Sequence, residues 1–471
     1  MATDFYSELD LAFHWMKIRS EMERLKLYSE FAAFYNNDYE NIQKILYDET
    51  LNNPYSAETL KTLKFSHVNM IDKTISRLTS GIYTIQPKRE YDDAEKIDDV
   101  SANDNLENFL AEIKYNQKIK DGFKKAVYYN VVLLHPVYDA ELKKIRIDVI
   151  TPDNFTVKTK KDFYQIEEVA LKRADQNGEI YYSIWNSEEH YIRYSGTEIK
   201  ISPDGNESGV NPFSPVLPFT ILRIKDGNDF YGEPNWNLYL NQKDVDKLNT
   251  DLVRSQIQMV NNIWFGVNTD LPSNTSFTAG QLIQVKQPID GLQVSLDSIS
   301  ANVDYDQARE NIDWKIKTVQ NSEGLSSSST DTKVSQLSGV AKNIDELELY
   351  EKREEYKEIL FNAEQDLIGK CIMVNNKYFT NSTLPEVKVN IYFSEDKESE
   401  SIDDKIKRRK METDIGYKSP VDYTMEDLEV SEKEAIQILT DAKAENEQFT
   451  TVAQDNAAEL MKQKNNVTAN N

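Results

Sequence analysis

The side chains best suited to chemistry in this sequence are four histidines and a single cysteine. His14, His67, His135 and His190 lie far apart along the chain, and no two of them have the spacing of a metal-binding pair. Cys371 has no second cysteine to pair with, so the chain cannot form an internal disulfide. These residues predict neither a metal site nor a bound cofactor.

Carboxylates are the other abundant reactive groups, with 80 aspartates and glutamates in 471 residues. Adjacent pairs such as Asp92–Asp93 and Asp98–Asp99 have the residue types that a carboxylate-dependent hydrolase needs. In so acidic a chain such pairs arise by chance, and nothing places them in a cleft. The sequence also lacks a glycine-rich phosphate loop and a Gly-x-Ser-x-Gly motif. We therefore predict that the protein is not an enzyme, with a carboxylate-dependent hydrolase as a distant alternative.

The charge balance limits the kinds of partner that the protein can hold tightly. The 55 lysines and arginines leave a formal net charge of -25. Proteins that grip DNA are usually basic, because affinity comes largely from neutralising phosphates. The composition therefore argues against a repressor or a nuclease, but it agrees with a conduit whose acidic wall lets a duplex slide. No run approaches the roughly 18 apolar residues of a membrane helix, and Met1–Phe5 shows no signal-peptide pattern, which predicts a cytoplasmic origin without membrane contact.

The elements that would position a functional surface lie between residues 232 and 376. A first helix is predicted to open at Glu233–Pro234 and to run through Ile263, with Val245, Leu252 and Met259 forming a narrow apolar stripe. Amide side chains flank this stripe, which favours packing against similar helices. Short apolar pairs broken by proline and glycine follow, and the residues from Leu282 to Val285 have the pattern of a strand.

Helical spacing returns at 303 and is predicted to stop at Glu323–Gly324. The segment from Leu325 to Ser338 is rich in serine and has no apolar period, so we expect a mobile loop there. A second and much longer helix begins after Gly339 and keeps three- and four-residue apolar spacing to Asn376. Cys371 lies on its apolar side, so a buried position is expected.

The remaining sequence mixes helices and strands. Residues 1–130 have mainly helical periodicity, with helices predicted over Val68–Tyr83 and Asn105–Tyr129. The pattern from Val131 to Ile201 alternates as in strands, and Asn177–Gly178 is a hairpin signal. One more strand is predicted over Val387–Phe393. The fold class is therefore α+β, without a βαβ repeat.

Several short motifs, in their order along the chain, resemble those of one viral protein family. The strand Ile147–Thr151 ends in a Pro-Asp-Asn turn, and Asn211-Pro212-Phe213 leads into a strand over Leu217–Leu222. Gly232 precedes the first helix described above, and Leu337–Ala341 opens the long one. This order is similar to that of the portal proteins of tailed bacteriophages, of the kind found in long-tailed phages of Gram-positive bacteria. The chain departs from the pattern at Asn130, where a glycine would be expected before the strand.

The resemblance implies a portal-protein fold and a ring of twelve subunits at one capsid vertex, through which double-stranded DNA enters and leaves. It also implies a domain map. Residues 1–231 and 340–397 would form a wing, 232–263 and 303–323 two stem helices, 264–302 a clip, 324–339 a tunnel loop, and 398–471 a crown with the C-terminal tail. The expected partners are further copies of the chain, the terminase motor, a head-to-tail adaptor, the major capsid protein and the scaffold. The expected location is the virion, after synthesis in the bacterial cytoplasm.

Three groups of candidate site residues follow from this map. Stem cations would be Lys315 and Lys317, and residues that dock a neighbouring subunit or an adaptor would be Trp264, Phe265 and Leu282. The tunnel-loop residues that would face DNA are Leu325, Ser326, Ser327, Ser328, Ser329, Thr330, Lys333 and Gln336. For the lysines, a solvated role or an intersubunit salt bridge is an open alternative, and for the clip residues local packing is one. A structural adaptor or scaffold of the phage head that never contacts DNA is the alternative for the whole protein.

Overall fold

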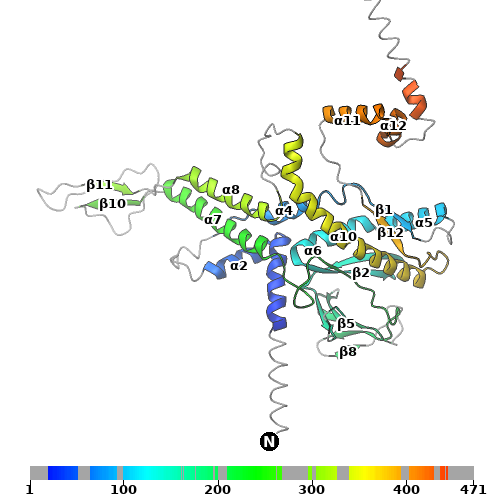
Figure 1. Ribbon diagram of the computed structural model, residues 1–471. Coiled ribbons are helices and arrows are strands. Elements are labelled where there is room, and N and C mark those ends of the chain that lie inside the picture. The colour runs from blue at the N-terminus through cyan, green and yellow to red at the C-terminus, as the bar shows by residue number, and fades with distance from the viewer. Residues whose placement is uncertain are drawn as a thin grey trace, which may run out of the picture. The chain divides into compact units, whose positions relative to one another are not determined.

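A computed structural model of the chain describes residues 20–50, 64–92, 99–160, 162, 164–175, 177–194, 197–199, 209–260, 263–267, 295–299, 304–325, 339–393, 402–428, 435–440 and 442–443. The chain divides into two compact units. The first comprises Met1–Ser335 with Asp345–Asp396, and the second comprises Gln336–Ile344 with Lys397–Asn471. The described residues of the first unit contain both helices and antiparallel sheets, which confirms the predicted α+β class (Figure 1).

The two larger sheets of the first unit are antiparallel. One has the order β3-β2-β9, with β2 (Val131–Asp139) between β3 (Lys144–Ile150) and β9 (Thr220–Arg223). The other has the order β4-β5-β6-β7-β8, formed by β4 (Phe155–Thr159), β5 (Ile166–Ala174), β6 (Ile180–Asn186), β7 (His190–Tyr194) and β8 (Thr197–Ile199). The predicted hairpin at Asn177–Gly178 is confirmed, because β5 and β6 pair across it and Gly178 has φ +82°.

Two helices, α5 (Asp99–Glu112) and α6 (Tyr115–Tyr129), occupy the region where a single helix over 105–129 was expected. Lys114 breaks it by adopting a left-handed backbone with φ +54°. Apolar spacing continues through both helices, since Leu110, Ile119 and Phe123 are all buried. The helical spacing of apolar residues in the sequence therefore could not reveal that the helix is interrupted at Lys114.

Asn130, the position where a glycine was expected from the sequence, has a positive φ. Its φ is +71°, which asparagine tolerates better than most residues do. Its side chain donates to the carbonyl oxygens of Lys225 and Tyr231 at 2.9 and 3.0 Å and accepts from the Lys225 amide at 2.9 Å. A Cβ at Gly232 would lie 2.3 Å from Asn130 Nδ2, so glycine at 232 leaves room for this connection. Asn130 therefore holds the chain at Lys225 and Tyr231 close to the start of β2.

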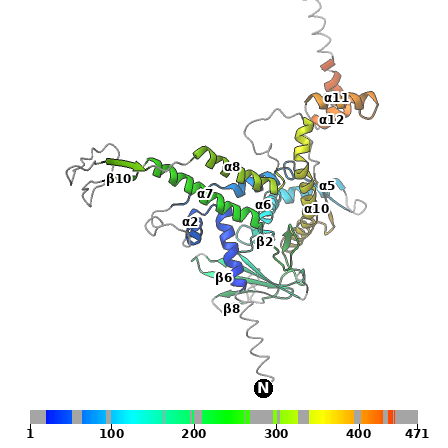
Figure 2. The same cartoon turned by 60° about the vertical axis from the view of Figure 1, so that its left-hand side comes forward.

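The segment after Gly232 forms α7 (Trp236–Val260), which begins later than Glu233–Pro234. Asn235 caps it by accepting a hydrogen bond from the Leu238 amide at 3.0 Å. The helix also ends before Ile263, which instead begins β10 (Ile263–Val267). β10 pairs antiparallel with β11 (Ser295–Ile299), and α8 (Tyr305–Ser322) then returns beside α7 (Figure 1, Figure 2).

The end of α8 agrees with its predicted stop. Gly324 has φ +81°, its amide donates to Asn321 O at 2.9 Å, and the Leu325 amide donates to Gln320 O at 3.0 Å. This pair of bonds is the Schellman motif that closes many helices. Leu325 is 1% exposed, and Lys352 of the long helix donates to Glu323 O at 2.8 Å. The turn at the end of α8 is therefore fixed on both sides of Gly324, by Lys352 at Glu323 and by the burial of Leu325 in the core.

The long helix α10 (Gly339–Tyr378) has the predicted extent. Its buried side chains recur every three or four residues through Leu349, Tyr356, Leu360 and Leu367, and Cys371 is fully buried as expected. The strand predicted near 389 is β12 (Val389–Tyr392), which pairs with β1 (Lys88–Tyr91).

The other helices of the first unit are α2 (Tyr39–Thr50), α4 (Met70–Thr79) and a helix over residues 20–35. The second unit contains α11 (Ile402–Asp414) and α12 (Pro420–Leu428). These two helices contact each other through Tyr423, whose hydroxyl donates to Glu412 and whose ring lies under the Arg409 guanidinium at 4.7 Å.

Candidate functional site

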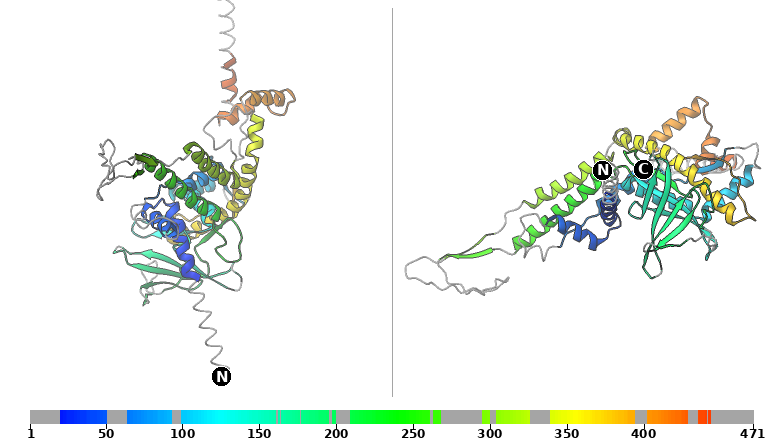
Figure 3. Two further views of the ribbon diagram at one scale, coloured as in Figure 1. Left: turned by 90° about the vertical axis from the view of Figure 1, so that its left-hand side faces the viewer. Right: turned by 90° about the horizontal axis from the view of Figure 1, so that it is seen from below.

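The helix pair formed by α7 and α8 is the element on which most of the predicted site residues depend. Its strands β10 and β11 continue from the ends of α7 and α8, where the chain leaves one helix and enters the other (Figure 3). At the opposite end, Asn237 Nδ2 donates to Ser322 Oγ at 2.8 Å and to Glu323 Oε1 at 3.0 Å. These contacts fix the antiparallel register of the two helices.

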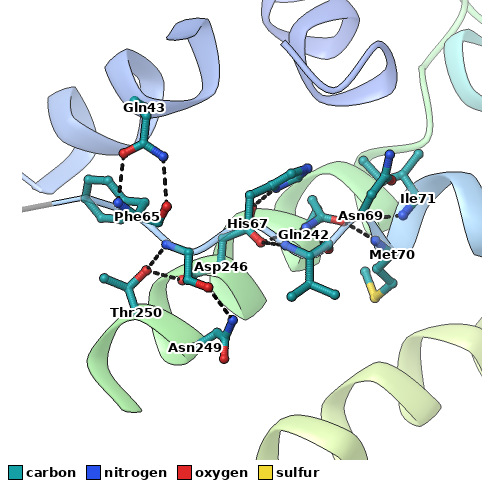
Figure 4. A network of polar contacts seen from close by, with 12 residues as sticks. Gln43, Phe65, His67, Asn69, Met70, Ile71, Gln242, Asp246, Asn249 and Thr250 are labelled. Carbon is teal, nitrogen blue, oxygen red and sulfur yellow. Dashed lines mark hydrogen bonds and ion pairs between the residues drawn. The ribbon is translucent and has the colours of Figure 1, made fainter. Parts of the chain in front are cut away.

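The first half of α7 is tied to the segment before α4 by buried amides. Gln242 is fully buried and uses both ends of its side chain (Figure 4). Its oxygen accepts from the amides of Met70 and Ile71 at 2.8 and 3.3 Å, and its nitrogen donates to Val68 O at 2.8 Å and Asp246 Oδ1 at 2.9 Å. A side chain from α7 thus satisfies donors that the first turn of α4 would leave unpaired.

The turns of α7 that follow extend the same network. Asp246, also fully buried, lies 2.6 Å from His67 Nδ1 and accepts from the Val68 amide at 3.1 Å. Thr250 accepts from the Ser66 amide at 2.9 Å, and Asn249 donates to Ser66 Oγ at 2.7 Å. Residues in successive turns of α7, three or four positions apart, therefore anchor the extended segment before α4. The network fixes α7 against the segment before α4, and the end of α7 that leads to β10 extends from this fixed part.

Gln242→Glu should reduce the free energy of unfolding by about 3 kcal/mol, because an oxygen would replace the amide that donates to Val68 O and Asp246. Urea unfolding followed by circular dichroism measures the loss. Asn241→Asp is the matched amide-to-acid control on the same helix, because its side chain bonds only within α7 at Asn237, and it should change stability by less than about 0.5 kcal/mol. Equal losses in the two variants would contradict the anchoring role of Gln242.

The two predicted stem cations are both engaged within the chain. Lys315 Nζ lies 2.6 Å from Asp244 Oδ2, so it links α8 to α7. Its side chain is 26% exposed, and that of Asp244 is 52% exposed. Lys317 is partly exposed and also has an interaction partner. This salt bridge of Lys315 lies within the chain and differs from the intersubunit salt bridge left open for it, so a contact with DNA stays a prediction.

The remaining candidate residues fall largely outside the described part of the chain. Ser326 to Thr330, Lys333, Gln336 and Leu282 lie there. Trp264 and Phe265 lie in β10, where they are paired with Ser298 and Asp297 of β11. Leu325, which the sequence assigned to the loop facing DNA, is instead buried in the core. Its burial follows from the Schellman motif, which turns the residue after Gly324 back toward the helix. Leu325 is therefore a core residue of the first unit and not a residue that faces DNA.

A surface that the sequence reasoning missed lies on the same helix pair. Large apolar side chains are exposed on α7 at Leu240 (47%), Leu248 (43%) and Val253 (41%), and on α8 at Trp314 (67%). A tryptophan exposed to this extent is unusual on a soluble surface. The sequence could have revealed the exposure of Trp314, because this residue does not share the helical spacing of Ile312, Ile316 and Val319, which pack against the core. We call these four side chains together the helix-pair surface, and at 100° per residue Leu240, Leu248 and Val253 lie on different sides of α7.

The three histidines in the described part of the chain lie in two separate places. His14 lies outside the described residues, and His67 is paired with Asp246. His135 and His190 are buried between the two large sheets. Within the described part of the chain, no cluster of three or more histidine, cysteine, aspartate or glutamate side chains could hold a metal ion.

Burial shifts both of these buried histidines toward the uncharged form. Desolvation lowers the pKa of His190 to about 4, and burial with the nearby Arg173 places the pKa of His135 well below its usual value. The unfolded chain binds these protons near pH 6.5, whereas the folded chain does so only at lower pH. Their contribution to stability is therefore complete above pH 6.5 and is lost as the pH falls toward 4.

Removing one of these histidines should flatten the pH dependence of stability. Each proton taken up only on unfolding contributes a slope of about 1.4 kcal/mol per pH unit. Between pH 6.5 and about 4, the free energy of unfolding of His190→Gln should therefore depend on pH with a slope that is smaller than that of the parent protein by this one contribution. Urea unfolding of the two proteins at each pH measures the difference. Parallel curves for the two proteins would show that His190 is not held uncharged in the folded state.

Comparisons with known proteins supply no independent assignment. No protein-family model matches this chain, and no curated protein matches its sequence. None of the helices in the described ranges has the length and hydropathy needed to cross a bilayer.

Proposed function

We propose that this chain is the subunit of a phage portal, a ring of about twelve copies that forms a channel for double-stranded DNA at one capsid vertex. The proposal rests on the order of the sequence motifs, which resembles that of portal proteins, together with the α+β class of the fold. In the portal fold, α7 and α8 would be the stem helices, β10 and β11 part of the clip, and α10 the long helix of the wing. The longer segment of the second unit begins at Lys397, next to the expected start of the crown at 398, whereas its other segment, Gln336–Ile344, falls in the expected tunnel loop and the start of the long helix. No bond-making chemistry is required of any residue.

The observation that carries the proposal is the helix-pair surface. Leu240, Leu248, Val253 and Trp314 lie exposed on a helix pair whose base is held rigid by Gln242 and Asp246. Exposed apolar groups on a rigid element are typical of a surface that other subunits cover. A second copy of the chain is the natural cover in a ring, since every subunit presents the same helix pair to its neighbour.

The negative net charge of the chain is more compatible with a channel through which DNA slides than with a protein that binds DNA tightly. Twelve copies at -25 each give a ring of about -300 formal charges. Such a wall repels phosphates and leaves the duplex free to move, with sparse lysines setting local contacts. Because Lys315 is paired with Asp244, the tunnel-loop lysine, Lys333, becomes the principal candidate for a contact with DNA.

The proposed partners follow from the same assignment. They are the terminase motor and a head-to-tail adaptor, which would dock near Trp264 and Phe265 of β10, together with the major capsid protein and the scaffold. The assembled ring would reside in the virion. A structural adaptor of the phage head that never contacts DNA is the competing function, and it requires no open bore.

The mass of the purified protein in solution tests the assembly. Mass photometry at low salt should show a closed species near twelve copies of the 54.5 kDa chain, about 650 kDa. A neighbouring ring size such as thirteen copies would also support the proposal, because closure and not the exact number is required. A population that remains monomeric at all concentrations would contradict it.

A further inference from the structure

A cavity of about 310 Å³ lies on the helix pair, between residues of α7, Lys315 of α8 and Thr50 at the end of α2. Phe65 and Leu248 supply apolar surface to its lining, and Asp244 and Lys315 are among its polar residues. Phe65 is 4% exposed, whereas Leu248 is 43% exposed and belongs to the helix-pair surface. The cavity therefore extends the helix-pair surface inward to a residue of the core.

The charges of the lining leave hydrogen-bond acceptors available. Both lysines of the lining are engaged within the chain, Lys315 with Asp244 at 2.6 Å and Lys247 with Glu49 at 2.5 Å. The Asp244 side chain is 52% exposed, and a carboxylate accepts several hydrogen bonds, so it can accept another while it keeps this ion pair. Asp251 adds a second carboxylate to the lining. A group that fits the cavity is therefore mostly apolar and carries a hydrogen-bond donor.

Trp314 of α8 is a side chain of this kind. The indole is a large apolar ring with one donor, Nε1–H, and no acceptor. At 67% exposure it is the most exposed member of the helix-pair surface. Tryptophan is enriched among the residues that dominate protein–protein binding, where it fills a pocket on the partner. Trp314 thus has the chemistry of an interface anchor.

Trp314 and the cavity lie on different sides of α8. Ile312, Ile316 and Val319 of this helix pack against the core. At about 100° per residue, Trp314 points about 140 to 160° away from each of these three side chains. It lies about 100° from Lys315, which lines the cavity, and it is not itself part of the lining. Each chain therefore offers one indole and one separate cavity to other copies.

An anchor and a cavity on different sides of one subunit produce a head-to-tail contact. Each copy inserts its anchor into one neighbour and receives the anchor of the other neighbour. Repeated contacts of this type close into a ring when the rotation between copies allows it, whereas a two-fold dimer needs one patch that meets itself. The placement of Trp314 is therefore the one that a ring requires.

We propose that Trp314 of each subunit inserts into the cavity beside Leu248 of the partner subunit. Its ring packs against Leu248 and Phe65 of the partner subunit, and its Nε1–H donates to a carboxylate of the lining. The ion pair between Lys315 and Asp244 stays in place at the edge of the contact. This inference rests on the proposed ring and adds the residues that meet across its interface.

Photocrosslinking in the assembled protein tests the contact. Benzoylphenylalanine in place of Trp314 keeps an aromatic side chain, and mass photometry shows whether rings are present. Irradiated rings should give covalent dimers and higher species on a denaturing gel, with crosslinks from position 314 to residues 244–251 or to Phe65. Intact rings whose crosslinks lie elsewhere, or that give none, would overturn this contact and leave the ring standing. A parent protein that forms no rings would overturn both.

A double-mutant cycle measures the same contact without a photoreactive group. Trp314→Ala and Leu248→Trp should each raise the concentration at which half of the rings dissociate by tenfold or more, the first by emptying the cavity and the second by filling it. Combining them moves the bulky ring from one side of the contact to the other, so the double variant should recover most of the loss. Trp314→Ala with Leu142→Trp, which adds the ring at an exposed position outside the cavity, should recover nothing. Additive losses in the double variant would show that positions 314 and 248 do not meet.

Discussion

Arg89→Met should lower the free energy of unfolding by about 3 to 5 kcal/mol, the largest single effect expected in the first unit. Arg89 of β1 and Glu364 of α10 are both fully buried, with Arg89 Nε donating to Glu364 Oε2 at 2.9 Å. The Tyr83 hydroxyl donates to the other carboxylate oxygen at 2.5 Å. Removing the guanidinium would leave a carboxylate without its counter-charge in the core. Urea unfolding at neutral pH measures the loss.

The double variant Arg89→Met with Glu364→Leu separates a buried-charge penalty from a packing defect. It should recover most of the loss, because replacing both ions by apolar groups removes the uncompensated charge. Lys88→Met, on the same strand, changes a cation that is 72% exposed and should alter stability by less than about 0.5 kcal/mol. If the double variant is no more stable than Arg89→Met, the ion pair is not the source of the effect.

Trp314→Glu combined with Leu248→Glu should abolish ring assembly while leaving the subunit folded. Both side chains are exposed in the single chain, at 67% and 43%, so a charge there costs little stability in the monomer. A neighbour that covers them would have to bury two carboxylates without partners, in a ring already about -300 in charge. Mass photometry reports the loss of the large species, and circular dichroism reports retained folding.

Leu142→Glu is the matched control for this variant. Leu142 is 69% exposed in the turn between β2 and β3, so it undergoes the same change of residue type away from the helix pair. Rings should form normally in this protein. Intact rings in the Trp314 and Leu248 variant would show that the helix-pair surface lies outside the subunit interface.

Local signals in the sequence predicted several elements because the residues that set them are adjacent in the chain. The hairpin at Asn177–Gly178, the end of α8 at Gly324 and the extent of α10 all follow from turn residues or from apolar period. The break at Lys114 could not be seen, because lysine rarely adopts a left-handed backbone. The start of α7 was predicted too early, because Pro234 was expected at the first helical position, whereas Asn235 caps the helix and Trp236 begins it.

The site was harder to predict because its contacts join residues far apart in the sequence. Gln242 was assigned only to an amide-rich flank, yet it caps α4 about 170 residues away. For Lys315 a salt bridge was left open, but its partner could not be named, because nothing in the sequence of α8 reveals Asp244 of α7. Leu325 begins a polar run, and only the fold shows that it turns inward. Helical spacing can be recognised within a short stretch of sequence, whereas a contact between residues far apart in the chain cannot.

Electron microscopy of the purified full-length protein tests the central claim most directly, since a portal must close around an open bore. The account predicts rings with a central hole wide enough for a DNA duplex, in which α7 and α8 of neighbouring subunits lie side by side and the segment following Leu325 faces the hole. Single subunits, or a closed particle with a filled centre, would contradict the assignment of this chain as a channel-forming portal.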